Sequence, residues 1–145
     1  MADRLVRRIL SMLPDQFGVD GSIPDYCKQA RTPAYTTFAA SIGKGKKVGF
    51  AMLVMNNPMT AELWVMGVLP EFHGQGVGSS LITRLEEEAR KRGARYMMVK
   101  TIGPGQNDPK FLGTFSFYRK NGYVMLVEYD FIWKGDRCAI LLKKL

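Results

Sequence analysis

The sequence predicts a mixed α/β fold in which a mostly antiparallel sheet is flanked by helices. Three β-prone runs joined by short turns predict an antiparallel meander over residues 35–68. An apolar strand, a glycine-rich turn, an amphipathic helix and a second apolar strand follow over residues 61–101, and the two strands of such a unit are normally parallel. Two β-prone runs near the end of the chain predict a hairpin. With 145 residues, of which 46% are hydrophobic, we expect residues 1–145 to form one domain.

The predicted elements follow one another without repeats or long linkers. Apolar residues at helical spacing predict a first helix over Arg4–Leu13, which Pro14 ends, and a second helix that begins near Ser22 and fades before Pro33. The later elements are strands over Tyr35–Ile42, Lys47–Met55 and Ala61–Val68, a helix over Gly76–Arg92, a strand over Tyr96–Thr101, a helix over Lys110–Lys120, and a hairpin of Tyr123–Trp133 with Arg137–Lys143.

The helix over residues 76–92 carries three acidic residues, each four positions ahead of a basic residue. Such i,i+4 pairs in this orientation contribute about 0.2 to 0.5 kcal/mol each. The pairs are Glu86 with Arg90, Glu87 with Lys91 and Glu88 with Arg92. We therefore expect this run of charge to lie on a solvated helix face.

A glycine-rich turn lies between the third predicted strand and the helix that begins near Gly76. A turn of this kind points several backbone N–H groups at one place, and the helix macrodipole adds about half a positive charge there, so the place suits a phosphate. A P-loop does not fit, because Gly78 is followed by Ser79 and Ser80 and not by lysine. A dinucleotide-binding turn fits weakly, because residues 70–72 separate the glycines from the strand.

Two motifs, in this order, resemble those of the GNAT superfamily of N-acetyltransferases. The family's loop for the acyl-CoA pyrophosphate reads Arg/Gln-x-x-Gly-x-Gly/Ala after a strand that ends Val-x-Pro, and residues 68–70 and 73–78 are similar to it. His73 stands where the family usually has Arg or Gln, which is a mild departure because the loop acts mainly through backbone donors. Residues 117–123 resemble the family's Phe-Tyr-x-x-x-Gly-Phe segment.

The resemblance implies a GNAT-like fold and an acetyl-CoA-dependent N-acetyltransferase that transfers an acetyl group directly to a primary amine of a small molecule or a protein. The expected fold departs from the family in one respect: the usual first strand is missing or shortened, because the chain opens on a helix. That region shapes the acceptor pocket in the family, so the acceptor stays open. The alternative function is a catalytically weak acyl-CoA-binding sensor or interaction domain. A basic nucleic-acid-binding domain ranks last.

The resemblance implies Tyr118 as the general acid. An amine near pH 7 is mostly protonated, so a base must take its proton and an acid must protonate the departing CoA thiolate. The family's tyrosine at this position lies beside the CoA sulfur. The other interpretation of Tyr118 is a core aromatic, although a buried phenol needs a polar partner.

The resemblance implies Glu62 as the general base, because of its distance ahead of the loop. Glu62 is four residues from Met66, about 13 Å along a straight strand, so the reaction requires a bulge, which Gly67 could mark, or a chain of water. An exposed carboxylate at a strand end, without a catalytic role, explains Glu62 equally well. Glu71 and Glu128 are weaker candidates for the base.

The resemblance also implies residues that hold acetyl-CoA. Main-chain groups of Met66, Gly67 and Val68 would pair with the thioester carbonyl and the pantetheine amides where the strand splays, although an ordinary buried strand has the same letters. Asn107 is a candidate for a further contact, because Phe111 stands where many family members have Asn. The expected phosphate-binding residues are His73, Gly74, Gln75, Gly76, Val77, Gly78 and Ser79.

Charge and cysteine usage limit the partners. The net charge of +8 favours an anionic partner such as CoA, although nucleic acid or an acidic protein would also fit. Cys27 and Cys138 match no metal-ligand spacing, so we expect reduced, buried thiols and no metal. No run approaches the roughly 20 apolar residues of a membrane span, and the N-terminus lacks a signal-peptide core, so we expect a cytoplasmic protein.

The acceptor and the oligomeric state, including a homodimer, are left open by the sequence. A cationic amine would be attracted by acidic side chains if these lined the acceptor pocket. The candidates are Asp15, Asp20, Asp25, Glu128 and Asp130.

Overall fold

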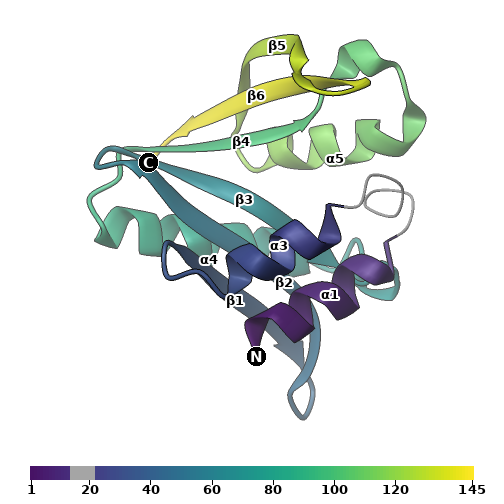
Figure 1. Cartoon of the computed structure of the whole chain (residues 1–145), viewed down its shortest axis with the longest axis vertical. Coiled ribbons are helices and arrows are strands. Elements are labelled where there is room, and N and C mark those ends of the chain that lie inside the picture. Colours follow the sequence, from purple (N-terminus) through teal and green to yellow (C-terminus); the bar gives the residue numbers. More distant parts are fainter. Residues whose placement is uncertain (14–21) are drawn as a thin grey trace.

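The computed structural model describes residues 1–13 and 22–145, and Figure 1 shows how the elements are arranged. Six strands form one sheet in the order β1-β2-β3-β4-β6-β5, in which β3 and β4 are parallel and the other neighbours antiparallel. The strands are β1 (Tyr35–Ile42), β2 (Lys46–Asn57), β3 (Thr60–Val68), β4 (Tyr96–Ile102), β5 (Val124–Trp133) and β6 (Asp136–Lys144). The helices are α1 (Ala2–Ser11), α3 (Ile23–Ala30), α4 (Val77–Lys91) and α5 (Pro109–Lys120), with short 3₁₀ turns η1 (Pro70–Phe72) and η2 (Pro104–Gln106).

The predicted mixed α/β fold is confirmed, and most element bounds agree to within one or two residues. The first helix is shifted, because α1 begins and ends two residues earlier than predicted. Met12 N donates to Ile9 O and Leu13 N to Leu10 O, so the chain leaves the helix through a tight 3₁₀-like turn. Pro14, predicted to end this helix, lies outside the described residues. Helices α1 and α3 precede β1.

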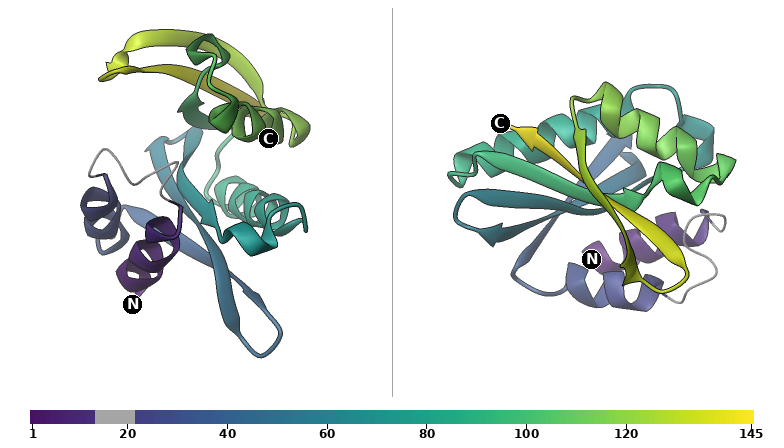
Figure 2. Two further views of the ribbon diagram at one scale, coloured as in Figure 1. Left: turned by 90° about the vertical axis from the view of Figure 1, so that its right-hand side faces the viewer. Right: turned by 90° about the horizontal axis from the view of Figure 1, so that it is seen from above.

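Helices cover both faces of the sheet (Figure 2). On one face, α1 and α3 pack on β1, β2 and β3, and their apolar residues form a cluster with Phe50 and Met52 of β2. On the other face, α4 and α5 share a cluster that includes Leu53, Leu85 and Tyr118. The two clusters give each face of the sheet its own buried layer.

Gly67 allows α1 to approach β3. The sequence suggested that Gly67 marks a bulge, but this is wrong, because Gly67 pairs regularly with Phe50. A Cβ atom at position 67 would lie 3.0 Å from Cγ2 of Ile9 and 3.1 Å from Cδ1 of Leu13. The glycine is therefore required by helix packing rather than by strand geometry.

Gly67→Ala is expected to destabilise the protein by about 1–3 kcal/mol, because the added methyl group overpacks the contact with α1. Urea unfolding followed by circular dichroism measures this change. Gly113→Ala is the matched control, because Gly113 lies in α5 and a Cβ there meets nothing within 4 Å. The control should be neutral or gain up to about 1 kcal/mol from helix propensity. Equal stability of Gly67→Ala and the wild type would contradict this account of the glycine.

The bulge in β3 lies at Trp64 instead. Met52 of β2 pairs with Val65, whereas the next residue, Leu53, pairs with Leu63, so Trp64 is the extra residue. As a result Leu63 belongs to the layer of α4, and Val65 to the layer of α1 and α3. Glu62, which precedes Leu63, therefore lies on the α1 and α3 face, and the bulge shortens the path along β3.

Strands β3 and β4 separate beyond their first residues. They pair only from Thr60 with Tyr96 to Leu63 with Val99, while β3 continues against β2 and β4 continues against β6. Figure 1 shows the two strands diverging from their common start. In the described sheet, residues 64–68 of β3 form no strand pairing on the side that faces β4. This separation of the two strands agrees with the predicted splay.

The predicted solvated face of α4 is wrong at Glu86. This side chain is only 5% exposed, and its Oε2 accepts a 2.8 Å hydrogen bond from the Tyr123 hydroxyl and lies 3.0 Å from Nζ of Lys143. Of the predicted pairs, Glu88 and Arg92 form an ion pair at 3.0 Å. Glu86 is buried because Tyr123, which lies between α5 and β5, and Lys143 of β6 contact its carboxylate, so its partners are distant in sequence.

Candidate functional site

The turn between β3 and α4 has the geometry of an anion site. Gly74 and Gly76 have φ of +75° and +82°, a left-handed conformation that L side chains rarely adopt. Gly76 caps α4, and the first helical bond runs from Ser80 N to Gly76 O at 3.0 Å. The N–H groups of Val77, Gly78 and Ser79 precede this bond, so they lie free of the helical ladder at the positive end of the dipole. Free N–H groups at a helix start of this kind suit an anion such as a phosphate.

The two long side chains of the turn bind the turn itself. Nε2 of His73 lies 2.6 Å from the Val68 carbonyl oxygen, and Nε2 of Gln75 donates to the Glu71 carbonyl at 3.0 Å. His73 thereby occupies one of the main-chain groups of Val68 that the sequence assigned to the cosubstrate. The hydrogen bonds of His73 and Gln75 thus hold the turn in place, and any phosphate contact of these side chains stays a prediction.

Gly78 brings the start of α4 against α5. A Cβ at this position would lie 2.8 Å from Cζ of Phe117 and 3.5 Å from Cε of Met66. We name the turn of residues 73–78 the phosphate turn, after its predicted role. It meets the end of β3 and the helix that carries Tyr118 around one glycine. Met66 itself packs in the α4 layer, so its side chain lies on the opposite face from Glu62.

Tyr118 lies in the core beside the splayed strands. It is 5% exposed, and its ring lies 5.4 Å from that of Phe117 and 6.1 Å from that of Tyr123. Burial raises the pKa of the Tyr118 hydroxyl, and the Tyr26 hydroxyl adds to this shift. The phenol thus stays protonated throughout the neutral range, as a proton donor requires.

Glu62 is not an exposed strand-end carboxylate. It is only 2% exposed, its Oε1 accepts a 2.8 Å hydrogen bond from Nδ2 of Asn56, and its Oε2 lies 3.4 Å from Nζ of Lys100. Asn56 and Lys100 were not singled out from the sequence. Strand pairing could have identified both residues. Asn56 lies two residues after Val54, the partner of Glu62 on β2, and Lys100 follows Val99, the last residue of β4 that pairs with β3.

The weaker candidates for a base are less suited to the role. Glu71 is exposed in η1. Glu128 accepts 2.8 Å hydrogen bonds from the Gly105 N–H and from Nε of Arg137, and these partners lower the pKa of its carboxyl. A carboxylate committed in this way holds η2 against the β5–β6 hairpin and is a poor proton acceptor.

The acidic residues suggested for a cationic acceptor do not form a cluster in the described part of the chain. Asp25 and Asp130 are exposed, and Glu128 is paired with Arg137. Asp15 and Asp20 lie outside the described residues. Asn107 lies directly after η2 with φ of +53° and is exposed, so its CoA contact stays a prediction.

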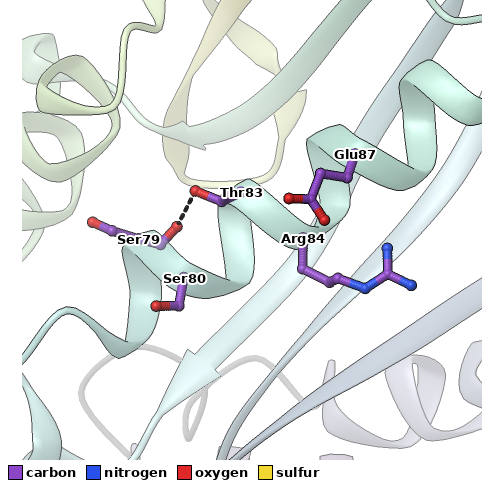
Figure 3. Close-up of a pocket in the computed structure, with 5 residues that line it drawn as sticks. All are labelled: Ser79, Ser80, Thr83, Arg84 and Glu87. Carbon is purple, nitrogen blue, oxygen red and sulfur yellow. Dashed lines mark hydrogen bonds between the residues drawn. The ribbon is translucent and has the colours of Figure 1, made fainter.

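A surface pocket of about 400 Å³ continues along α4 from the phosphate turn (Figure 3). Thr83 Oγ1 donates to the Ser79 carbonyl at 3.0 Å, and the Arg84 guanidinium lies 4.5 Å from the ring centre of Phe38. The sequence identified only Ser79 among the lining residues. The others recur at helical spacing after it, which was the available signal. The lining residues are Ser79, Ser80, Thr83, Arg84 and Glu87.

The described residues contain neither a cluster of metal-ligating side chains nor a membrane-spanning helix. Outside residues 14–21, no group of three or more His, Cys, Asp or Glu side chains could hold a metal ion. None of the helices in the described ranges combines the length and the hydropathy of a transmembrane segment. Cys27 and Cys138 are free and buried, as predicted.

Several solved structures with a similar fold are acetyltransferases or GNAT-family proteins by name. A GNAT-family protein from Desulfovibrio desulfuricans has 20% sequence identity and a TM-score of 0.79, with 98% of this chain and 91% of that chain covered. An aminoglycoside 6'-N-acetyltransferase complexed with coenzyme A has 17% identity and a TM-score of 0.75, with 98% and 89% covered. A GNAT family acetyltransferase from Elizabethkingia anophelis with acetyl-CoA bound has 17% identity and a TM-score of 0.71, with 94% and 90% covered.

The chain spans 66% of a nourseothricin acetyltransferase, to which it is 21% identical with a TM-score of 0.67. A search of curated proteins found no match. The model of the acetyltransferase (GNAT) family matches residues 5–123. This match includes the phosphate turn, Glu62 and Tyr118. Because it covers well over half of the sequence, the chain belongs to the GNAT family of acetyltransferases and is an acyltransferase.

Proposed function

We propose that this protein is an acetyl-CoA-dependent N-acetyltransferase that transfers an acetyl group directly to a primary amine of a small molecule or a protein. The observation that carries the proposal is the separation of β3 from β4 after Leu63 and Val99. This separation leaves a free strand edge between the phosphate turn and the two candidate catalytic side chains, Glu62 and Tyr118.

Acetyl-CoA is the cosubstrate, and the chain offers separate donors for its parts. The N–H groups at the start of α4 suit the diphosphate. The main chain of Met66 and Gly67, on the free edge of β3, suits the pantetheine amides and the thioester carbonyl, where an N–H donor would stabilise the oxyanion that forms during attack. The pocket along α4 extends the phosphate turn toward the nucleotide end of the ligand.

The two catalytic roles follow from the proton balance of the reaction. Glu62 takes a proton from the acceptor ammonium, and the free amine nitrogen forms a bond to the carbonyl carbon. The carbon–sulfur bond then breaks, and Tyr118 gives its proton to the sulfur. The nitrogen loses its second proton to solvent as the amide forms, and a proton from solvent restores the Tyr118 phenol. The raised pKa of Tyr118 keeps the proton on the phenol until the thiolate develops.

The acceptor reaches the site from the α1 and α3 side, because Glu62 lies on that face of the sheet. The chain carries a net charge of +8, which suits a polyanionic cosubstrate such as CoA. We place the reaction in the cytoplasm, which is consistent with two unpaired, buried thiols.

A calorimetric titration with acetyl-CoA tests the proposal, with NADPH and ATP as phosphate-bearing controls. We expect micromolar binding of acetyl-CoA alone. Amine acceptors are then screened by thiol release, using kanamycin, spermidine and a peptide with an N-terminal alanine. Equal binding of all three nucleotides, or binding without thiol release by any amine, would contradict the proposal.

A further inference from the structure

The two oxygens of the Glu62 carboxylate have different surroundings. Burial of a carboxylate is costly unless hydrogen bonds and an opposite charge compensate it. Oε1 accepts the 2.8 Å hydrogen bond from Nδ2 of Asn56, which also lies 3.3 Å from Sδ of Met98. This bond fixes one oxygen and, with it, the plane of the carboxyl group.

The second oxygen is compensated in charge but not in hydrogen bonding. Oε2 is buried and accepts no hydrogen bond from any described residue, although Nζ of Lys100 lies 3.4 Å away. A buried acceptor without a donor is rare in folded proteins. Oε2 can therefore accept a hydrogen bond from a further N–H or O–H group.

Lys100 is itself held in place. Its Nζ lies 5.0 Å from the ring centre of Trp64, whose indole N–H donates to Oε1 of Gln29 at 2.6 Å. The Lys100 side chain is 27% exposed, whereas that of Glu62 is 3% exposed, so Lys100 connects the buried carboxylate to the surface. Trp64 is the bulged residue of β3, so the bulge supplies the surface on which the ammonium rests.

The groups that face Glu62 come from the neighbouring strands. Asn56 comes from β2, Lys100 and Met98 from β4, and Cys138 from β6, which pairs with the end of β4. Burial raises the pKa of the Cys138 thiol, and Glu62 adds to this effect while Lys100 opposes it. The thiol is therefore neutral near pH 7, and Lys100 is the charged partner of Glu62 among these groups.

We propose that Oε2 of Glu62 is the atom that receives the proton of the acceptor, and that Asn56 and Lys100 are positioning residues that fix the carboxylate for this transfer. The inference rests on the proposed function, since it assigns an atom and two supporting residues to the general base. Because Oε2 is buried, the proton passes from the acceptor nitrogen through one water to this oxygen, which lacks a donor. Lys100 compensates the buried charge, so the acceptor is not required as a permanent counter-ion.

The test compares truncated and conservative variants of the full-length protein. Asn56→Ala and Lys100→Met should each lower kcat about tenfold, with the Kd of acetyl-CoA changed less than twofold. Asn56→Gln and Lys100→Arg, which keep a donor or a charge, should recover a large part of the loss. Lys144→Met is the control, because Lys144 is exposed on β6 and should keep the wild-type rate.

A double-mutant cycle separates positioning from an independent effect. If Asn56 acts only through Glu62, the combination of Asn56→Ala with Glu62→Gln should be no slower than Glu62→Gln alone, within about twofold. Two results would overturn the inference in a wild-type protein that is active. One is a double variant whose loss of kcat is the product of the two single losses, and the other is a wild-type kcat in both Asn56→Ala and Lys100→Met. Acetyl-CoA binding without turnover by the wild type would overturn the proposed function, and the inference with it.

Discussion

Replacing Tyr118 with phenylalanine is expected to lower kcat by roughly 10²- to 10⁴-fold, the range typical for loss of a general acid. The substitution removes one oxygen and keeps the ring that packs 5.4 Å from Phe117, so the fold and the phosphate turn should persist. The Kd of acetyl-CoA should change less than twofold. Steady-state kinetics at saturating amine, together with calorimetry, measure the two quantities.

Tyr123→Phe is the matched control, because it removes a hydroxyl from the neighbouring buried tyrosine. That hydroxyl donates to Glu86 at 2.8 Å, so its loss should cost about 1.5–3 kcal/mol of stability while kcat stays near the wild-type value. The expected pattern is opposite for the two tyrosines: one loses rate and the other loses stability. A wild-type rate for Tyr118→Phe would make Tyr118 a core aromatic only, and equal rate losses in both variants would point to packing.

The order of elements could be predicted because it depends on local patterns. Alternation of apolar residues, glycine and proline at the turns, and helical spacing gave each strand and helix its place. The splay of β3 from β4 could be expected only through the family resemblance. The amino-acid sequence of residues 64–68 does not distinguish a free strand edge from an ordinary buried strand.

The errors arose where tertiary packing decides the surroundings of a side chain. Glu86 has a basic residue four positions later, which favours a surface pair, yet its buried carboxylate contacts Tyr123 and Lys143, which lie far from it in the sequence. Gly67 permits a bulge, yet α1 packs against it. Both residues are explained by contacts with distant segments, which a local pattern does not contain.

In the candidate site too, continuous motifs could be predicted from the sequence, whereas contacts between distant segments could not. The turn at residues 73–78 and the segment with Tyr118 could be identified because each is a continuous motif. Asn56 and Lys100 lie on two other strands, and they contact Glu62 only because the register of the sheet places them there. Supporting residues of this kind follow from strand pairing and not from sequence spacing.

Glu62→Gln is expected to lower kcat near pH 7 by roughly 10²- to 10³-fold, since it removes the group that takes the proton from the acceptor. The amide has nearly the same shape as the carboxyl and can still accept a hydrogen bond from Asn56, so the Kd of acetyl-CoA should be retained. Glu71→Gln and Glu128→Gln are the controls for the two other carboxylates, and both should keep a rate within a fewfold of the wild type. A large loss in Glu71→Gln with none in Glu62→Gln would move the base to η1.

The pH dependence of Glu62→Gln tests the assignment of Glu62 as the general base more strictly. The deficit of the variant is the ratio of the wild-type kcat to its own kcat at a given pH. A primary amine has a pKa of about 10, so the fraction of free amine rises about tenfold for each pH unit below that value. The variant lacks a base and can use only the free amine, so its rate should rise with pH and its deficit should shrink between about pH 7 and 9.5. Kinetics across this range, with buffers matched in ionic strength, give the deficit at each pH. A deficit that stays constant would mean that Glu62 serves the buried ion pair with Lys100 and not the proton transfer.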